Sequence, residues 1–341
     1  MASTPTKDLG FVIAIFIGIG ILWVLMGRPV GNADSLNSPF LSSSFVPSPR
    51  NEDKNNDGKS VIKKPSEVEA NGVITIKDVS YIKSPWYGQV KLGRGNSASN
   101  TYPSEEYITL STSRRNKDSI AITGWLLENG RKFRTYDRGS RKVVKGQSAV
   151  VAIPQGAEIF LGKSSQTLHP IILKPGDKAV VTSGKMPNRN SDIKVNFSFK
   201  TNKCTGYLED LPKLDFTPKL KMSCPDPEKV AGASSLPDDC FTFVKRLRNC
   251  HTPDTEEYRD RNGDLVRNHL DKVTGLSRYC RDWVTTRFSY TACLGRHVTD
   301  KDFDGKEWRI FLSRQWELWD DDREVITLYD PQGRLVDQIT Y

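Results

Sequence analysis

The sequence predicts a mainly β protein, in which a disulfide-linked α-helical insertion interrupts an antiparallel β-sandwich and a transmembrane helix precedes both. Three observations predict this. Short apolar runs separated by turn residues fill residues 71–203, as in sandwiches of short strands. All six cysteines lie between Cys204 and Cys293. The strand pattern then returns in residues 307–341.

The first expected element is a signal anchor within residues 1–30, because residues 9–27 are apolar and carry no charge. A helix of that length spans about 28 Å, close to the hydrocarbon core of a bilayer. The alternative is a signal peptide cleaved near Ala33, but the apolar run is longer than that of most signal peptides. An even number of cysteines after such a segment favours an oxidising compartment. We therefore expect a single-pass membrane protein whose bulk is extracytoplasmic.

Residues 31–70 are expected to form a disordered linker. They are rich in Ser, Pro, Asn and charged residues and show no sustained apolar period. Such a segment buries too little apolar surface to offset the loss of chain entropy on folding.

Residues 71–203 are expected to form the first part of the sandwich. Ile108 and Leu110 show the two-residue alternation of a half-buried strand. Gly130 and the proline-glycine pairs further on are turn signals. The expected strands cover residues 73–82, 107–110, 120–127, 149–153, 157–161, 171–173, 179–182 and 195–199.

Residues 204–306 are expected to be a helical insertion, with helices over residues 238–248, 255–272 and 277–287. The cysteines of this region favour three disulfides, whose pairing the sequence leaves open. Zinc is the alternative, but no two cysteines show the short spacing that zinc sites use. The disulfide candidates are Cys204, Cys224, Cys240, Cys250, Cys280 and Cys293.

Residues 307–341 are expected to complete the sandwich. Strands over residues 324–329 and 334–341 flank Asp330-Pro331-Gln332-Gly333, a strong hairpin signal. A lone hairpin is marginally stable, so we expect it to join the earlier strands. Trp316 and Trp319 would share one face of a helix and pack between insertion and sandwich, and the alternative is a carbohydrate-stacking surface.

Four stretches resemble the lamin tail domain family, whose fold is an immunoglobulin-like β-sandwich. They are residues 106–110 (EYITL), 120–127 (IAITGWLL), 172–177 (ILKPGD) and 324–337 (EVITLYDPQGRLVD). The arrangement looks like the membrane-anchored bacterial versions of the domain, with a Cys-containing insertion as a departure from the nuclear proteins. The resemblance implies binding of DNA, protein or cell-surface ligands, and it brings no catalytic residues.

Positive charge is concentrated in the first part of the predicted sandwich. Residues 71–203 hold 22 Lys and Arg against 9 Asp and Glu, a net charge of +13 in a chain whose total is +9. A basic hairpin with interleaved aromatic residues is suited to a polyanion, although the alternative is a solvated loop that protects a sheet edge. The predicted ligand-binding residues are Arg131, Lys132, Arg134, Tyr136, Arg138, Arg141, Lys142 and Lys145.

Metal, cofactor and catalytic signals are few. Asp300, Asp302 and Asp304 match the start of a calcium loop, but Phe311 stands where the loop needs an acid, which favours an acidic turn instead. No cofactor or resident metal is expected. No common hydrolase or nucleotide-binding motif accompanies the four histidines, and His297 beside the Asp300–Asp304 cluster is the remaining candidate for catalysis.

The sequence therefore favours a non-catalytic, membrane-anchored binding protein. The expected ligand is an anionic envelope polymer, extracellular nucleic acid or another surface protein. The alternative is an envelope hydrolase with its site where the insertion meets the sandwich, and a purely structural adhesin module is the third possibility.

Overall fold

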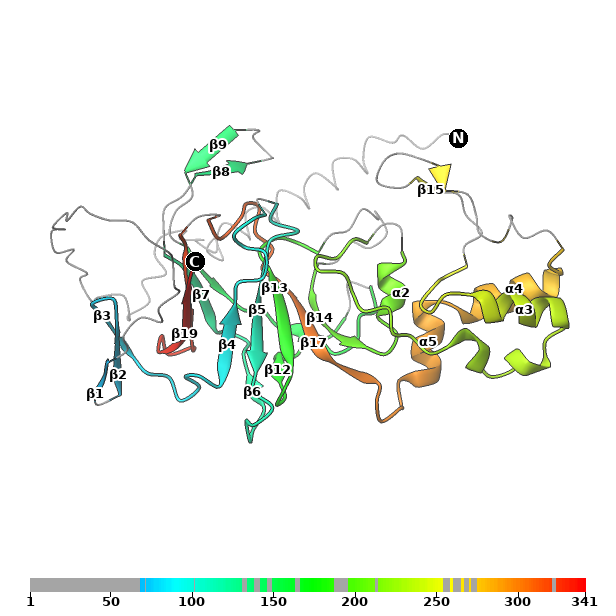
Figure 1. Cartoon of the computed structure of the whole chain (residues 1–341), viewed down its shortest axis with the longest axis horizontal. Helices are drawn as coiled ribbons and strands as arrows, with labels where there is room; N and C mark the ends of the chain where they lie inside the picture. Colours follow the sequence, from blue (N-terminus) through cyan, green and yellow to red (C-terminus); the bar gives the residue numbers. More distant parts are fainter. Residues whose placement is uncertain are drawn as a thin grey trace, which may run out of the picture. The chain divides into compact units, whose positions relative to one another are not determined.

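The computed structural model describes residues 68–70, 72–100, 102–130, 134–137, 142–145, 149–162, 166–186, 196–211, 214–253, 258–259, 265–266, 270, 275–320 and 323–341. The chain is mainly β, as predicted (Figure 1). Within these ranges no helix is long and apolar enough to cross a bilayer, and the predicted anchor lies outside them.

The largest sheet has six strands, which come from before and after residues 204–303, the segment that we call the cysteine region. Its order is β11 (Gly156–Ala157), β14 (Ser198–Asn202), β17 (Asp304–Phe311), β13 (Lys178–Thr182), β5 (Tyr107–Thr112) and β4 (Val90–Gly93). Strand β17 follows the cysteine region in sequence, yet it pairs with β13 and β14, which precede that region. Figure 1 shows β17 in orange between the green strands β13 and β14.

A second sheet has four strands in the order β10 (Val150–Ala152), β7 (Leu126–Asn129), β18 (Val325–Tyr329) and β19 (Leu335–Thr340). Strand β18 pairs antiparallel with β7, with Leu328 opposite Leu127. The turn between β18 and β19 is fixed by Asp330, whose Oδ1 accepts the backbone N–H groups of Gln332 and Arg334 at 3.0 Å each. Gly333 supplies the left-handed φ of +72° that this turn needs.

Both sheets contribute to one apolar core, which we call the sheet core. Ile108 and Leu110 enter it from β5, Leu127 from β7 and Leu328 from β18, and all four are fully buried. Trp308 of β17 lies in the same cluster. Burying a large apolar side chain contributes roughly 1.5–3 kcal/mol, so this core ties the strands on both sides of the cysteine region into one folded body.

Two predicted strands are interrupted by turns. The strand predicted over residues 73–82 is a hairpin, because Lys77 and Asp78 adopt positive φ at its centre. The strand predicted over residues 120–127 is broken by Gly124 at φ +81°. The first break gives β2 (Val73–Ile76) and β3 (Val79–Ile82), and the second gives β7 and β6 (Ile120–Ala121), which pairs with β12 (Ile172–Leu173). Strand β1 (Val68–Ala70), at the end of the expected linker, pairs with β2.

The cysteine region folds around its own apolar cluster, which contains all six cysteines. They form three disulfides, as predicted, and no cysteine is free, so the zinc alternative is wrong. The pairs are Cys204–Cys293, Cys224–Cys250 and Cys240–Cys280. The helices are α2 (Gly206–Glu209), α3 (Asp238–Arg246), α4 (Arg278–Arg287) and α5 (Tyr290–His297), with 3-10 turns η1 (Pro227–Lys229) and η2 (Ala233–Ser235).

The helix predicted over residues 255–272 is wrong where the structure describes it. Strands β15 (Tyr258–Arg259) and β16 (Leu265–Val266) pair antiparallel there. The sequence between them contains Asn262-Gly263, a dipeptide typical of hairpin turns. Helix α5 was not predicted, and it begins where the Ser289 hydroxyl accepts the backbone N–H of Ala292 at 3.2 Å.

The helix expected around Trp316 and Trp319 is absent, because residues 312–320 form a loop. Trp319 is fully buried, but in the sheet core and not, as predicted, between the insertion and the sandwich, since no residue of 204–306 belongs to that cluster. Trp316 is 39% exposed, and the guanidinium of Arg314 lies 5.2 Å from its ring centroid. The two rings therefore do not share one surface.

Candidate functional site

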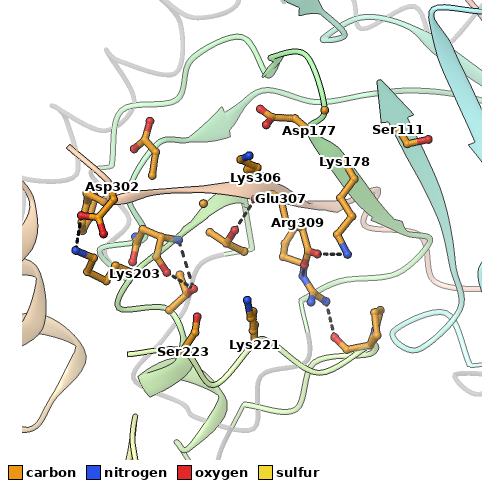
Figure 2. Close-up of a pocket in the computed structure, with 18 of the residues that line it drawn as sticks. Ser111, Asp177, Lys178, Lys203, Lys221, Ser223, Asp302, Lys306, Glu307 and Arg309 are labelled. Carbon is orange, nitrogen blue, oxygen red and sulfur yellow. Dashed lines mark hydrogen bonds and ion pairs between the residues drawn. The ribbon is translucent and has the colours of Figure 1, made fainter. Parts of the chain in front are cut away.

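An open cleft of about 1000 Å³ lies where the six-stranded sheet meets the cysteine region (Figure 2). Part of its lining is a row of three residues on adjacent strands. Ser111 of β5 is opposite Lys178 of β13, which is opposite Glu307 of β17. Arg309, two residues further along β17, lines the cleft beside this row.

One wall of the cleft is the loop that leads from α2 towards η1. Leu220 is buried in a cluster with Phe216 of the loop and Phe199 of β14, and its backbone N–H donates to Glu209 Oε2 at 2.8 Å. Its neighbours Lys219 and Lys221 are exposed and line the cleft. The burial of Leu220 thus fixes both lysines at the rim.

Arg309 clamps this wall to the sheet. It is 3% exposed, and its guanidinium donates to the backbone carbonyl oxygens of Pro218 and, at 3.1 Å, Lys219. Nε also forms an ion pair with Glu307 at 2.6 Å. Burial lowers the pKa of Arg309, and the nearby Glu307 opposes that shift.

The opposite wall contains the acids of the calcium candidate, and each of them contacts a lysine. Lys203 Nζ donates to Asp300 Oδ2 at 2.9 Å and to Asp302. Lys200 Nζ donates to Asp304 Oδ2 at 2.8 Å. Among the residues that the structure describes, no three acidic, His or Cys side chains are grouped so that they could hold a metal ion.

Lys200 is a buried cation at the end of this wall. Its side chain is 5% exposed and lies 3.4 Å from Glu158 as well as 2.8 Å from Asp304. Burial by itself lowers the pKa of Lys200, but the hydrogen bond and charge of Asp304 and the charge of Glu158 outweigh it, so the pKa is raised. Lys200 is therefore a fixed positive charge.

The charges that line the cleft are unevenly neutralised. Among the described lining residues, six are basic and four are acidic. Asp302 and Asp304 are paired as described, and Glu307 lies between Arg309 and Lys178, the latter at 2.7 Å. The buried Asp177 accepts the backbone N–H of Lys174 at 3.0 Å, and burial raises its pKa.

Three lysines in the lining have no such partner. The ammonium groups of Lys219, Lys221 and Lys306 form no ion pair or hydrogen bond with any residue in the described part of the chain, and all three residues are exposed. The charges of Lys306 and Lys219 oppose the rise that burial causes in the pKa of Asp177 and Glu209, but no hydrogen bond or ion pair holds either ammonium group there, so both can bind an anion without breaking an existing ion pair.

The basic hairpin predicted to bind ligand is described only in part. Arg134 and Tyr136 lie in β8 (Arg134–Asp137), which pairs with β9 (Lys142–Lys145). Lys142 and Lys145 are the end residues of β9. The remaining predicted residues Arg131, Lys132, Arg138 and Arg141 lie outside the described residues, so the ligand-binding role of the hairpin stays a prediction.

The catalytic candidate His297 lies at the end of α5, and its Nδ1 is 2.8 Å from Asp300 Oδ2. Asp300 also accepts a hydrogen bond from Lys203, which lines the cleft. His297 itself is not in the lining.

The sequence reasoning missed the three cleft lysines. The one local signal was the alternation Lys219-Leu220-Lys221 just before Cys224, which predicts two cations on one side of an extended segment. Lys306 joins them only through the pairing of β17 with earlier strands. Comparisons with family models, curated proteins and solved structures return no match to this chain.

Proposed function

We propose that this protein is a non-catalytic binding protein whose ligand is an anionic polymer, held in the cleft by Lys219, Lys221 and Lys306. The observation that carries the proposal is the pairing of the cleft's charges: its four carboxylates have partners, whereas these three ammonium groups have none among the described residues. An unpaired cation in an open cleft attracts phosphate, sulfate or carboxylate groups.

The proposal includes the compartment and the anchor. Three disulfides support an oxidising, extracytoplasmic location, since such bonds persist there. The apolar residues 9–27 are proposed as a single-pass membrane anchor and residues 31–67, up to strand β1, as its tether. The basic hairpin around β8 and β9 is proposed as a second contact for a long polyanion.

The finer identity of the fold is also a proposal. Two sheets that share one core, and a C-terminal hairpin that pairs with an early strand, are consistent with an immunoglobulin-like sandwich of the lamin tail type. In this proposal the cysteine region is the insertion, and its contribution to function is the wall that carries Lys219 and Lys221.

The test is the affinity of the full-length protein for sodium polygalacturonate and for inorganic polyphosphate, measured by titration calorimetry. The variant Lys219→Ala/Lys221→Ala/Lys306→Ala removes the unpaired cations. Exposed ion pairs contribute roughly 0.2–1 kcal/mol each, so removing three of them should lower the affinity about three- to hundredfold.

The matched control is Lys91→Ala/Lys117→Ala/Lys185→Ala, which removes the same charge from exposed lysines outside the cleft lining. It should change the affinity by much less. Equal losses in both variants contradict the cleft as the binding site, and absence of binding to both polymers contradicts the proposed function.

The hydrolase alternative has one observation in its favour, the hydrogen-bonded pair of His297 and Asp300 beside the cleft. A carboxylate that orients a histidine is a common element of acid–base catalysis. Binding by the cleft lysines predicts that His297→Ala leaves polymer affinity unchanged. Release of cleaved products that stops in His297→Ala would favour the enzyme instead.

A further inference from the structure

We infer that the cleft recognises a chain that carries hydroxyl groups as well as anionic groups, that is, a polyhydroxylated anionic polymer such as an acidic polysaccharide or a polyol phosphate. This inference rests on the proposed function and names the ligand class of the same cleft. Three features of the cleft support it: the positions of the unpaired lysines, the polar groups of the lining and the contacts that hold the walls in place.

The unpaired lysines come from two different segments. Lys219 and Lys221 are exposed on either side of the buried Leu220 in the loop. Lys306 belongs to β17, and its side chain leaves that strand on the opposite face from its neighbour Glu307, as Figure 2 shows. Cations on separate segments and on two faces of one strand suit an extended ligand with several anionic groups better than a single small anion.

Oxygen atoms also line the cleft. The exposed hydroxyls of Ser111 and Ser223 line it from the sheet and from the loop, and the carboxylates of Glu307 and Asp302 belong to the same lining. Paired carboxylates still accept hydrogen bonds from hydroxyl groups. They repel a ligand whose only polar groups are anionic, so they favour a chain in which hydroxyls separate the charges.

The lining lacks the features that other polyanions use. Phe303 is the one aromatic residue among the described lining residues, and it is 5% exposed, so it offers no face on which a nucleic-acid base could stack. The row of Ser111, Lys178 and Glu307 is polar and charged, so it forms no apolar pocket for the anchor side chain of a peptide. A hydroxylated chain needs neither.

The walls that carry these groups are held in place before a ligand binds. Arg309 fixes the carbonyl oxygens of residues 218 and 219, and the disulfide Cys224–Cys250 closes the far end of the same loop. A preorganised site loses less conformational entropy on binding, which permits selectivity from a few hydrogen bonds.

The experiment compares two polycarboxylates that differ in hydroxyl groups. Sodium polygalacturonate and sodium polyglutamate, matched in chain length and charge concentration, are titrated into the full-length protein. Polygalacturonate should bind at least about tenfold more tightly, as two or more hydrogen bonds imply. A parallel pair, polyglycerol phosphate against inorganic polyphosphate, tells whether carboxylate or phosphate is the preferred anion.

The variant Ser111→Ala/Ser223→Ala should weaken polygalacturonate binding about three- to tenfold and leave polyglutamate binding unchanged. The control Ser119→Ala/Ser234→Ala removes two exposed hydroxyls outside the lining and should alter neither.

Equal affinities for the two polycarboxylates, or tighter binding of polyglutamate, overturn this inference. If Lys219→Ala/Lys221→Ala/Lys306→Ala still binds these polymers more weakly than the parent protein does, the proposed anion binding stands. If this variant binds them as tightly as the parent, both the proposed function and this inference are overturned.

Discussion

The guanidinium of Arg309 in β17 donates a hydrogen bond of 3.1 Å to the backbone carbonyl oxygen of Lys219, 90 residues earlier in the chain. This contact joins the sheet to the loop that carries two of the unpaired cations. The shape of the cleft therefore depends on this contact, because the loop forms one of its walls and the sheet holds the loop in position.

Arg309→Met is expected to lower both stability and affinity. The change leaves the Glu307 carboxylate without its closest cation and the carbonyl oxygens of residues 218 and 219 without donors. Lys178 still pairs with Glu307 at 2.7 Å, so the loss comes mainly from the two carbonyl oxygens, and urea unfolding should show a destabilisation of about 1–3 kcal/mol. Polygalacturonate affinity should fall about three- to tenfold because the loop must then be ordered on binding. Arg115→Met, at an exposed position, should do neither.

The disulfide Cys224–Cys250 is expected to matter for binding, and Cys240–Cys280 only for stability. The two bridges close loops of 26 and 40 residues, so each double substitution to alanine should cost about 3 kcal/mol. Only the first bridge adjoins the loop with Lys219 and Lys221. Similar losses of affinity in both double variants would show that the local anchoring of the loop is unimportant.

Stability is expected to fall as the pH rises from about 4.5 to 8, with Glu106 as a main cause. Burial raises the pKa of Glu106 to about 8, although its carboxylate accepts the backbone N–H groups of Leu318 and Trp319 at 2.8 and 3.0 Å. The folded protein therefore retains a proton that the unfolded chain loses. The stability from this proton is full below pH 4.5 and disappears as the pH passes the folded pKa.

Glu106→Gln tests this pH dependence by urea unfolding across the same range. Removing the titrating group should reduce the slope of the unfolding free energy against pH. The reduction should reach up to about 1.4 kcal/mol per pH unit at the steepest point, which corresponds to one proton. Burial also raises the pKa of Glu324 and Glu209, so some slope should remain. A curve as steep as that of the parent protein would contradict the assignment, and the exposed Glu228→Gln serves as control.

Leu328→Ala is expected to destabilise the whole sheet core. Leu328 in β18 is fully buried opposite Leu127 of β7, and a leucine-to-alanine change in a core costs about 2–5 kcal/mol. Unfolding should remain a single transition at lower denaturant, because both sheets share this core. Leu161→Ala, at a position 56% exposed, should change stability by less than about 0.5 kcal/mol. Separate transitions for the two sheets in Leu328→Ala would contradict a shared core.

Strands with a clear local pattern were predictable, whereas β4 and the central β17 were not among the predicted strands, and residues 158–161, predicted as strand, are not strand. Alternation of apolar residues marks Ile108 and Leu110, and the Asp330–Gly333 turn marks the last hairpin, whose predicted strands match β18 and β19 to within a residue or so. The positive φ of Lys77 and Asp78 was not predictable from their residue types, so one strand was expected where a hairpin forms. The eight residues of α5 are too few for a periodic signal.

The cleft was less predictable than the fold. Counting charges finds the densest basic run, at residues 131–145, but not which carboxylates neutralise which cations. Lys203 has its charge compensated by Asp300 and Asp302, whereas Lys221 has no partner in the described structure, although both lysines precede a cysteine by no more than three residues. Such differences arise from contacts between distant segments, which a single sequence does not reveal.

The salt dependence of polygalacturonate binding tests the central claim most directly. The affinity of the full-length protein is measured between about 50 and 200 mM salt, with and without Lys219→Ala/Lys221→Ala/Lys306→Ala. If these ammonium groups displace the counterions of the ligand, the slope of log affinity against log salt should be shallower by roughly two in the triple variant. An unchanged slope and an unchanged affinity would contradict the account.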